Sequence, residues 1–334
     1  SIAPSLPKSI LDAVADAFAG QGESLNDLAR DYLEDYLMTT ILLVDIHLDR
    51  LRKGKLSLPQ ELWTGSAGNI WDRILRQATR EAGGKVTGHD HATGSGHFQN
   101  PWNYFLEFVA LDSFATDHPA KADAARRQAD PSLLLEDGLP DIQAIVVPRQ
   151  TTSSHRSASG RPSGTGPKRV MYVSTLYTGE TLHLLPLPAD MVVLDWQARL
   201  LAKLSSWGFE VLHKPHPEGP APPAKLAGFS GYRRLDAPFE SVWNEADLLL
   251  FDYPSSTTFG FALRTTKPLV LIDAGQFDWL PAAARDLGQR CAMVPARFDH
   301  DNRMMVDWQV LREATERAPL LADDTAFREH FLES

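Results

Sequence analysis

The sequence predicts an α/β protein of two domains, and three observations lead to that prediction. After residue 168, short apolar runs alternate with helical segments, a pattern typical of a parallel sheet covered on both faces. Before residue 149, apolar residues keep mostly helical spacing. Residues 149–168 hold no apolar run and are rich in Ser, Gly, Thr and Pro, as flexible linkers are. We therefore expect one domain over 1–148, a linker over 149–168 and a second domain over 169–334.

The amino-terminal domain is predicted to be reduced and largely helical. Apolar residues recur at intervals of three and four over 24–52, and the same pattern returns over 69–82 until two glycines end it. A short strand is expected over 85–89, followed by a loop rich in Gly and His. Residues 101–117 carry another helical pattern. We identify no more than one or two strands before residue 148.

Four short apolar runs are expected to form strands of the carboxy-terminal domain. They read RVMYVST from Arg169, EVLHK from Glu210, DLLLFD from Asp247 and PLVLID from Pro268. Helices are expected between them over 190–206, 240–246 and 257–266. In a parallel sheet of this kind, ligands bind at the carboxyl ends of the strands, where loops and helix N-termini present backbone N–H groups.

Composition restricts the function. The 334 residues carry a formal net charge of −10, which argues against a broad basic surface, so no nucleic-acid partner is expected. Cys291 is the only cysteine, which excludes an internal disulfide and a multi-cysteine metal site. No run approaches the roughly 20 apolar residues of a membrane span, and we see no signal peptide, so a cytoplasmic location is expected. Because the chain begins with Ser1 instead of Met, it is also compatible with a part of a larger multidomain chain.

The loop after the second of these strands suits an anion. It reads Lys-Pro-His-Pro over residues 214–217. Lys214 offers a cation and His216 a donor that can switch its charge, while Pro215 and Pro217 stiffen the loop. A histidine in such a loop is often only a surface residue, so His216 by itself would not define a site.

The loop after the third strand carries a run of hydroxyl groups. Ser255, Ser256, Thr257 and Thr258 open a predicted helix, where free N–H groups lie at its positive end. These residues could instead simply cap the helix. Because the carboxyl ends of parallel strands share one edge of a sheet, this loop and the Lys-Pro-His-Pro loop are expected to face one phosphate or pyrophosphate.

Together these loops resemble the carboxy-terminal half of bacterial surface-carbohydrate transferases of the GT-B fold, over residues 168–275. Such families include teichoic acid glycerophosphotransferases and the capsule and lipopolysaccharide transferases that use CMP-activated sugars such as Kdo or sialic acid. The resemblance implies a GT-B-like architecture of two Rossmann-type domains. It also implies that the two loops bind the phosphate of a CMP- or CDP-linked donor, through Lys214, His216, Pro217, Ser255, Ser256 and Thr257.

Two further residues are candidates on the donor side. Thr175 lies in the string YVSTLYTGE, which resembles the loop that faces the donor in such enzymes. Glu240 occupies a place where related folds often hold a ribose hydroxyl. Each residue also has an ordinary interpretation, since Thr175 could serve only turn chemistry and Glu240 could be a solvated acid at a helix start.

The string GHDHATGSGH resembles the loop that follows a strand in the acceptor-side domain of the same transferases. A transferase needs a base for the proton of the acceptor hydroxyl. We predict that Asp90 is this base, with His91 as its partner and Glu107, on the following helix, as the alternative. His89, His91 and His97 could instead bind a metal, but their spacing lacks the third ligand of a recognised zinc motif. The loop could also be a polar surface between domains.

The leading hypothesis is therefore an inverting, metal-independent glycosyltransferase of bacterial capsule, lipopolysaccharide or other surface-glycan synthesis, without a cofactor. Its partners would be a nucleotide-sugar donor and a glycan or lipid-linked glycan acceptor, which leaves room for peripheral association with the inner face of the membrane. The alternatives are a CDP-glycerol-type glycerophosphotransferase, a sugar-nucleotide epimerase, and a non-catalytic nucleotide- or glycan-binding module of a larger enzyme. The sequence does not name the base, the sugar or the acceptor.

Overall fold

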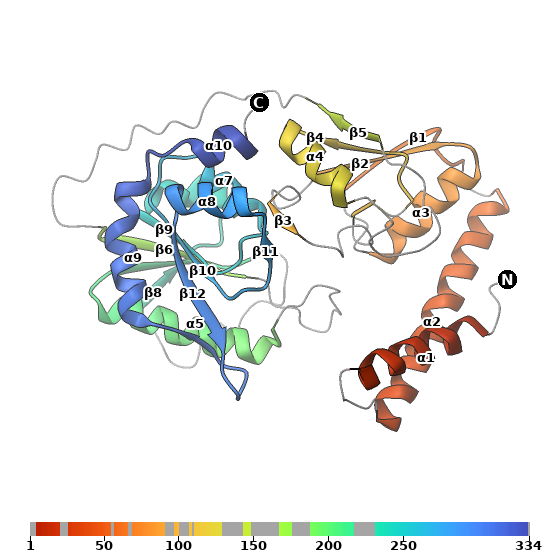
Figure 1. The fold of residues 1–334 in the computed structure, drawn as a ribbon, viewed down its shortest axis with the longest axis horizontal. Helices are drawn as coiled ribbons and strands as arrows, with labels where there is room; N and C mark the ends of the chain where they lie inside the picture. The colour runs from red at the N-terminus through yellow and green to blue at the C-terminus, as the bar shows by residue number, and fades with distance from the viewer. Residues whose placement is uncertain are drawn as a thin grey trace. The chain divides into compact units, whose positions relative to one another are not determined.

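The structure is a computed structural model in which two compact units can be described (Figure 1). Residues 1–88 with 105–113 form one unit, and 89–104 with 114–334 form the other. The described residues are 5–20, 26–54, 57–65, 69–90, 97–99, 107, 108, 110–128, 143–147, 167–175, 188–216 and 231–332. Residues 149–166 of the predicted linker lie outside them, so the predicted domain boundaries stay a prediction.

Three helices begin the chain: α1 (Ser5–Gly20), α2 (Asp27–Arg52) and α3 (Ile70–Glu81). The last two were predicted, and each begins at an asparagine that caps it. Asn26 Oδ1 accepts from the Ala29 N–H at 2.8 Å, and Asn69 Oδ1 accepts from the Asp72 N–H at 2.9 Å. An N-cap side chain satisfies one of the free N–H groups of the first turn, which fixes where each helix starts. The helix α1 was not predicted.

A four-stranded sheet has the order β1-β2-β4-β5. Its strands are β1 (Glu61–Thr64), β2 (Lys85–His89), β4 (Ser113–Thr116) and β5 (Gln143–Val146), with helix α4 (Pro119–Gln128) between the last two. Only β2 was predicted, so the expected strand count was too low. Residues 113–116 were predicted as helix, and that was wrong: Phe114 and Ala115 are buried, and the Asp112 carboxylate accepts from the Val86 N–H at 2.8 Å. Pairing along the sheet overrides the helical spacing.

The guanidinium of Arg76 organises the loops around α3. It is fully buried and donates to Thr64 Oγ1 at 2.7 and 3.0 Å, to the Gly65 carbonyl at 2.7 Å and to the Glu107 carbonyl at 2.9 Å. Burial lowers the pKa of Arg76, while the nearby charges of Glu107 and Asp72 raise it. A buried charge of this kind is tolerated because its donors find acceptors.

The larger sheet has seven strands in the order β13-β12-β10-β9-β6-β7-β8. They are β6 (Arg169–Val173), β7 (Glu210–Lys214), β8 (Tyr232–Arg234), β9 (Leu248–Phe251), β10 (Leu269–Asp273), β12 (Ala292–Phe298) and β13 (Met304–Val306). The first six run parallel and β13 is antiparallel at the edge. Numbered along the chain, the parallel strands lie in the order 3-2-1-4-5-6, the doubly wound arrangement.

Side chains of this sheet alternate between two apolar cores. Met171 of β6 packs with α6 (Phe239–Val242), α7 (Thr257–Leu263), α8 (Pro281–Arg290) and α10 (Ala326–Phe331). Val170 and Tyr172 pack with α5 (Asp190–Ser206) and α9 (Trp308–Leu321) on the other face (Figure 1). The predicted α/β class, with a parallel sheet buried on both faces, is confirmed.

Smaller elements complete the described chain: the 3₁₀ turn η4 (Trp243–Glu245), and strands β3 (Phe98–Gln99) and β11 (Asp278–Trp279), which pair antiparallel. Helix still predominates over strand among the described residues before 148. No helix in the described part of the chain combines the length and apolar character needed to span a bilayer.

Replacing Arg76 by Met should destabilise the protein. The change removes the buried guanidinium and its hydrogen bonds to Thr64, Gly65 and Glu107, so we expect a loss of about 3 kcal/mol in the free energy of unfolding. Urea titration followed by circular dichroism measures it. Arg80→Met, on the same helix, is the control, since it removes only a part-exposed ion pair with Asp112. Equal losses in the two variants would contradict the role given to Arg76.

Candidate functional site

The strand order reverses between β6 and β9, which are neighbours in the sheet. The helix after β6 is α5, which packs on one face, and the helix after β9 is α7, which packs on the other. Connections that leave toward opposite faces open a crevice at the carboxyl ends of the two strands. The loops that border this edge are therefore the candidate functional site.

Asp252 lies directly after β9 and is buried at this point. Its carboxylate accepts from Trp196 Nε1 at 3.1 Å, from the Thr175 N–H at 3.0 Å and from the Tyr172 hydroxyl. Burial raises the pKa of Asp252 to about 6, against the opposing effect of the three donors. The network connects β6, the loop after it, α5 and the end of β9.

His213 and Lys214 are the last two residues of β7, and both are buried. The His213 ring stacks on Tyr172 at 5.5 Å, and its Nε2 lies 3.1 Å from Ser174 Oγ. Burial, together with the charges of Arg234 and Lys214, lowers the pKa of His213 to about 4, so this ring is neutral near pH 7. The Lys214 ammonium donates to the Pro215 carbonyl at 3.0 Å, and burial lowers its pKa.

The other residues predicted on this side have different surroundings. His216 is half-buried and follows β7 by two residues, while Pro217 lies outside the described residues. Glu240 is an exposed residue of α6, and its charge, like that of Asp236, raises the pKa of Lys214. The structure therefore brings Lys214 and Glu240 within electrostatic reach of each other.

The run of hydroxyls after β9 divides into two kinds. Ser256 is the N-cap of α7, since its Oγ accepts from the Phe259 N–H at 3.1 Å and from Thr258 Oγ1 at 3.1 Å. The capping interpretation thus applies to Ser256. Ser255 is half-buried and hydrogen-bonds the hydroxyl of Tyr253, whose pKa burial raises to about 12. Thr257 is exposed.

Thr175 has a buried hydroxyl at the same edge of the sheet. Its N–H donates to Asp252, but its Oγ1 has no hydrogen-bond partner among the described residues. A buried polar atom without a partner costs free energy, so a ligand that reaches it gains a hydrogen bond. This hydroxyl is the feature of the edge that most directly suits a bound molecule.

The candidates for the catalytic base, Asp90 and Glu107, have separate partners in the structure. The Asp90 carboxylate accepts from Lys121 Nζ at 2.9 Å, and both side chains are almost fully buried. Lys121 also donates to Asp117 at 2.7 Å. His91 lies outside the described residues. Glu107 is half-buried, and its carbonyl is the one held by Arg76.

Two of the three histidines considered as metal ligands have different surroundings in the structure, and His91 lies outside the described residues. His89 is exposed, whereas His97 is buried against Phe327 and Phe331, with ring distances of 4.9 and 5.6 Å. Burial holds the pKa of His97 well below its usual range. Among the described residues, three potential metal ligands gather only in the turn before β13, at Asp299, His300 and Asp301, where backbone N–H groups already bind Asp299.

Sequence analysis missed the residues that organise the carboxyl edge. Tyr172, His213 and Asp252 stand in or directly after buried strands. Their signal was available, since a histidine inside the apolar run VLHK and an aspartate at the end of DLLLF must find partners when buried. The sequence did not show which partners these would be, because they are far away along the chain. Asp252 lies 80 residues from Tyr172 and 77 residues from Thr175.

Comparison with solved structures finds distant likenesses. The spinosyn forosaminyltransferase SpnP is 13% identical over 86% of this chain and 72% of its own, with a TM-score of 0.43. A structure of S. aureus MnaA with UDP is 10% identical over 88% and 78%, with a TM-score of 0.47. The glycosyltransferase SnogD from Streptomyces nogalater is 16% identical over 85% and 73%, with a TM-score of 0.39. Values this low do not establish a shared fold. No protein-family model and no curated protein matches the sequence.

The raised pKa of Asp252 has a measurable effect on stability. The folded state holds the Asp252 proton more tightly than the unfolded chain does, so protonation of Asp252 adds to the free energy of unfolding. This contribution is fully present below about pH 4. It is lost as the pH rises through about 6. We therefore expect the difference in unfolding free energy between the wild type and Asp252→Asn to fall by up to about 3 kcal/mol from pH 4 to pH 7.

The measurement is urea unfolding of both proteins across this pH range. His213 titrates in the same window with the opposite sign, but it is present in both proteins and cancels in the difference. Asp301→Asn removes an exposed carboxyl and serves as the control. A difference that stays constant with pH would show that Asp252 keeps an ordinary pKa.

Proposed function

We propose that the chain is a glycosyltransferase of the GT-B type whose nucleotide-sugar donor binds at the carboxyl edge of the seven-stranded sheet. The observation that carries the proposal is the reversal of strand order between β6 and β9. Beside it lies the buried hydroxyl Thr175 Oγ1, which has no hydrogen-bond partner among the residues that the structure describes. Doubly wound sheets bind nucleotides at such a point. The two loops that resemble those of the CMP-sugar transferases, which hold His216 and Ser255, follow strands that end at this same edge.

The donor is proposed to be CMP- or CDP-linked, with a Kdo- or sialic-acid-like sugar. Lys214 and His216 would face its phosphate, and Thr175 and Ser255 would donate hydroxyl hydrogen bonds. Glu240, exposed at the start of α6, would accept from a ribose hydroxyl. A cation and several hydroxyl donors can stabilise a leaving nucleotide, so transfer is proposed to proceed without a metal ion or a cofactor.

The acceptor is proposed to be a hydroxyl of a bacterial surface glycan, free or lipid-linked. Transfer with inversion needs a base that takes the hydroxyl proton as the sugar carbon is attacked from the opposite face. Asp90 stays the predicted base, with His91 as its partner and Glu107 as the alternative. The Asp90–Lys121 ion pair adds a condition, because an acceptor hydroxyl would have to share the carboxylate with the ammonium of Lys121.

Nucleotide binding is the first test. A thermal-shift panel of CMP, CDP, UMP, UDP, GDP and dTDP should show the largest stabilisation with a cytidine nucleotide, because a ligand that binds only the folded state raises its apparent stability. Release of that nucleotide on addition of an acceptor glycan would then report transfer. Binding without release would favour a non-catalytic module, and no shift with any nucleotide would contradict the donor site.

His216→Ala and Ser255→Ala should each weaken binding of the best nucleotide by roughly ten- to a hundredfold, the value of a charge-assisted hydrogen bond to phosphate. Isothermal titration calorimetry measures the affinity. His300→Ala is a matched control, because this histidine is exposed in the turn before β13. Unchanged affinity in both site variants would remove the two loops from the donor site.

The assignment of Asp90 as the base can be tested with variants that distinguish loss of the carboxylate from loss of its ion pair with Lys121. Asp90→Asn should keep nucleotide affinity and lower turnover by about 10²–10⁴, the usual contribution of general-base catalysis. Lys121→Met disrupts the same ion pair but leaves the carboxylate in place, so its turnover should fall much less. Equal losses of turnover and stability in the two variants would make Asp90 a structural partner of Lys121. Collapse only in Glu107→Gln would move the base to Glu107.

A further inference from the structure

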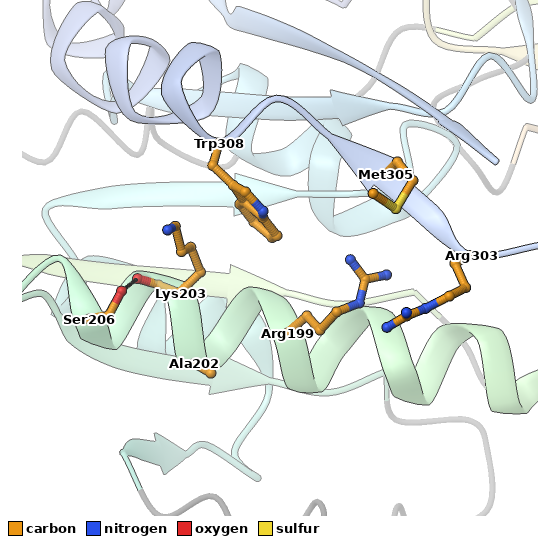
Figure 2. Close-up of a pocket in the computed structure, with 7 residues that line it drawn as sticks. All are labelled: Arg199, Ala202, Lys203, Ser206, Arg303, Met305 and Trp308. Carbon is orange, nitrogen blue, oxygen red and sulfur yellow. Dashed lines mark hydrogen bonds between the residues drawn. The ribbon is translucent and has the colours of Figure 1, made fainter. Parts of the chain in front are cut away.

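A pocket lies on the α5 and α9 side of the seven-stranded sheet and is lined by residues other than those of the carboxyl edge described above. It has a volume of about 470 Å³, within the range of small-molecule sites. Its lining comes from α5, from Arg303 and Met305 around β13, and from the first residue of α9 (Figure 2). None of the residues assigned to the donor contributes to it. Its chemistry combines cationic head groups with an apolar surface.

The ammonium of Lys203 is held in this pocket by aromatic rings. Its Nζ lies 5.7 Å from the ring centre of Trp207 and 5.8 Å from that of Trp308. Cation–π contacts orient an ammonium without neutralising its charge. In the described part of the chain Lys203 forms no ion pair, so its positive charge is available to an anion.

Two guanidinium groups extend the positive charge. Arg199 and Arg303 both bind the carboxylate of Asp195, at 2.8 and 2.9 Å, and Arg199 also donates to the Met304 carbonyl at 2.7 Å. One carboxylate therefore holds two cations in fixed positions. Lys203 adds a third cation to the lining of the pocket. The hydrogen bond and the charge of Asp195, and then the charges of Asp299 and Asp301, raise the pKa of Arg303. Because these carboxylates offset the charge of Arg303, we assign an incoming anion to Lys203 and Arg199.

The rest of the lining offers a flat apolar surface. In Figure 2 the indole of Trp308 points toward α5, between Lys203 and Arg199, with the Met305 side chain beside it. Trp308 also stacks on the buried Trp196 at 5.9 Å, which keeps its ring in place. A rigid aromatic ring beside an unneutralised cation suits a ligand that carries both a ring and an anionic group.

We propose that this pocket is a second binding site, for a phosphate- or carboxylate-bearing ligand whose ring packs against Trp308 and Met305. The anionic group binds Lys203 and Arg199. An acidic sugar unit and a nucleotide both have this chemistry. The site shares no lining residue with the proposed donor site, although Trp196, on which Trp308 stacks, also donates to Asp252.

Calorimetric titration with phenyl phosphate, which supplies one ring and one anion, tests the site. The wild type should bind it more tightly than inorganic phosphate, because the ring adds apolar contact. Lys203→Met, which keeps the length of the side chain and removes its charge, should weaken binding about tenfold. Lys85→Met, at an exposed lysine of β2, should bind like the wild type. Absence of binding to the wild type, or equal affinity in Lys203→Met, would overturn the proposal.

Two further arms separate the sources of the ligand. Glucuronate and CMP are titrated into the wild type and Lys203→Met, and only the affinity lost in the variant is assigned to this pocket. A larger loss for glucuronate indicates an acidic sugar, and a larger loss for CMP indicates a nucleotide. If Lys203→Met binds both glucuronate and CMP as tightly as the wild type does, the proposal is overturned. If Lys203→Met does not fold, Arg199→Gln, at the other cation assigned to the anion, replaces it and should also weaken binding of phenyl phosphate.

Discussion

The carboxylate of Asp252 connects the elements that meet where the strand order of the seven-stranded sheet reverses. It stands after β9 and accepts from Tyr172 of β6, from Trp196 of α5 and from the backbone of Thr175. A buried carboxyl without such donors would cost several kcal/mol, so the positions of these elements are coupled. Thr175 binds Asp252 through its N–H, while its hydroxyl has no hydrogen-bond partner in the described part of the chain. The proposed donor would bind at this hydroxyl.

Burial at this edge moves two titratable groups in opposite directions. Asp252 takes up a proton more readily than usual, and His213, beside Tyr172, loses its proton more readily. Both shifts follow from the cost of charge in a poorly solvated environment. Near pH 7 the charges close to the carboxyl ends of β6 and β7 are therefore the largely ionised Asp252, Lys214 and Arg234, together with the more exposed Asp236 and Glu240. A donor phosphate would enter an edge whose buried imidazole is neutral.

A different type of constraint acts on Asp90, the residue directly after β2. Lys121 of α4 is shared by the carboxylates of Asp90 and Asp117, and Asp117 also binds Arg264 at 3.2 Å. Removing one partner of a buried pair leaves the others uncompensated, which is why the chemistry of Asp90 cannot be judged from activity alone. The Asp90 side chain is both the proposed base and a partner in a buried ion pair. Only variants that change one of these roles at a time can distinguish an effect on turnover from an effect on stability.

The sequence by itself determined the α/β class, the parallel strands β6, β7, β9 and β10, and the edge at which polar loops follow them. Strands buried on both faces read as short apolar runs, and turn or cap residues mark their ends, so these features are local. The cap Ser256 belongs to the same kind of information. The two predicted donor loops could be located in this way, although Pro217 falls outside the described residues.

The tertiary structure decided what depends on residues far apart in the chain. It alone gave the strand order 3-2-1-4-5-6, the partners of Asp252, the Asp90–Lys121 pair and the pocket around Lys203. It also showed that residues 113–116, predicted as helix, form the strand β4. Helical spacing is a local preference, whereas strand pairing, burial of charge and the meeting of α5 with Trp308 are settled by contacts between distant segments. No pattern within a short window of sequence specifies those contacts.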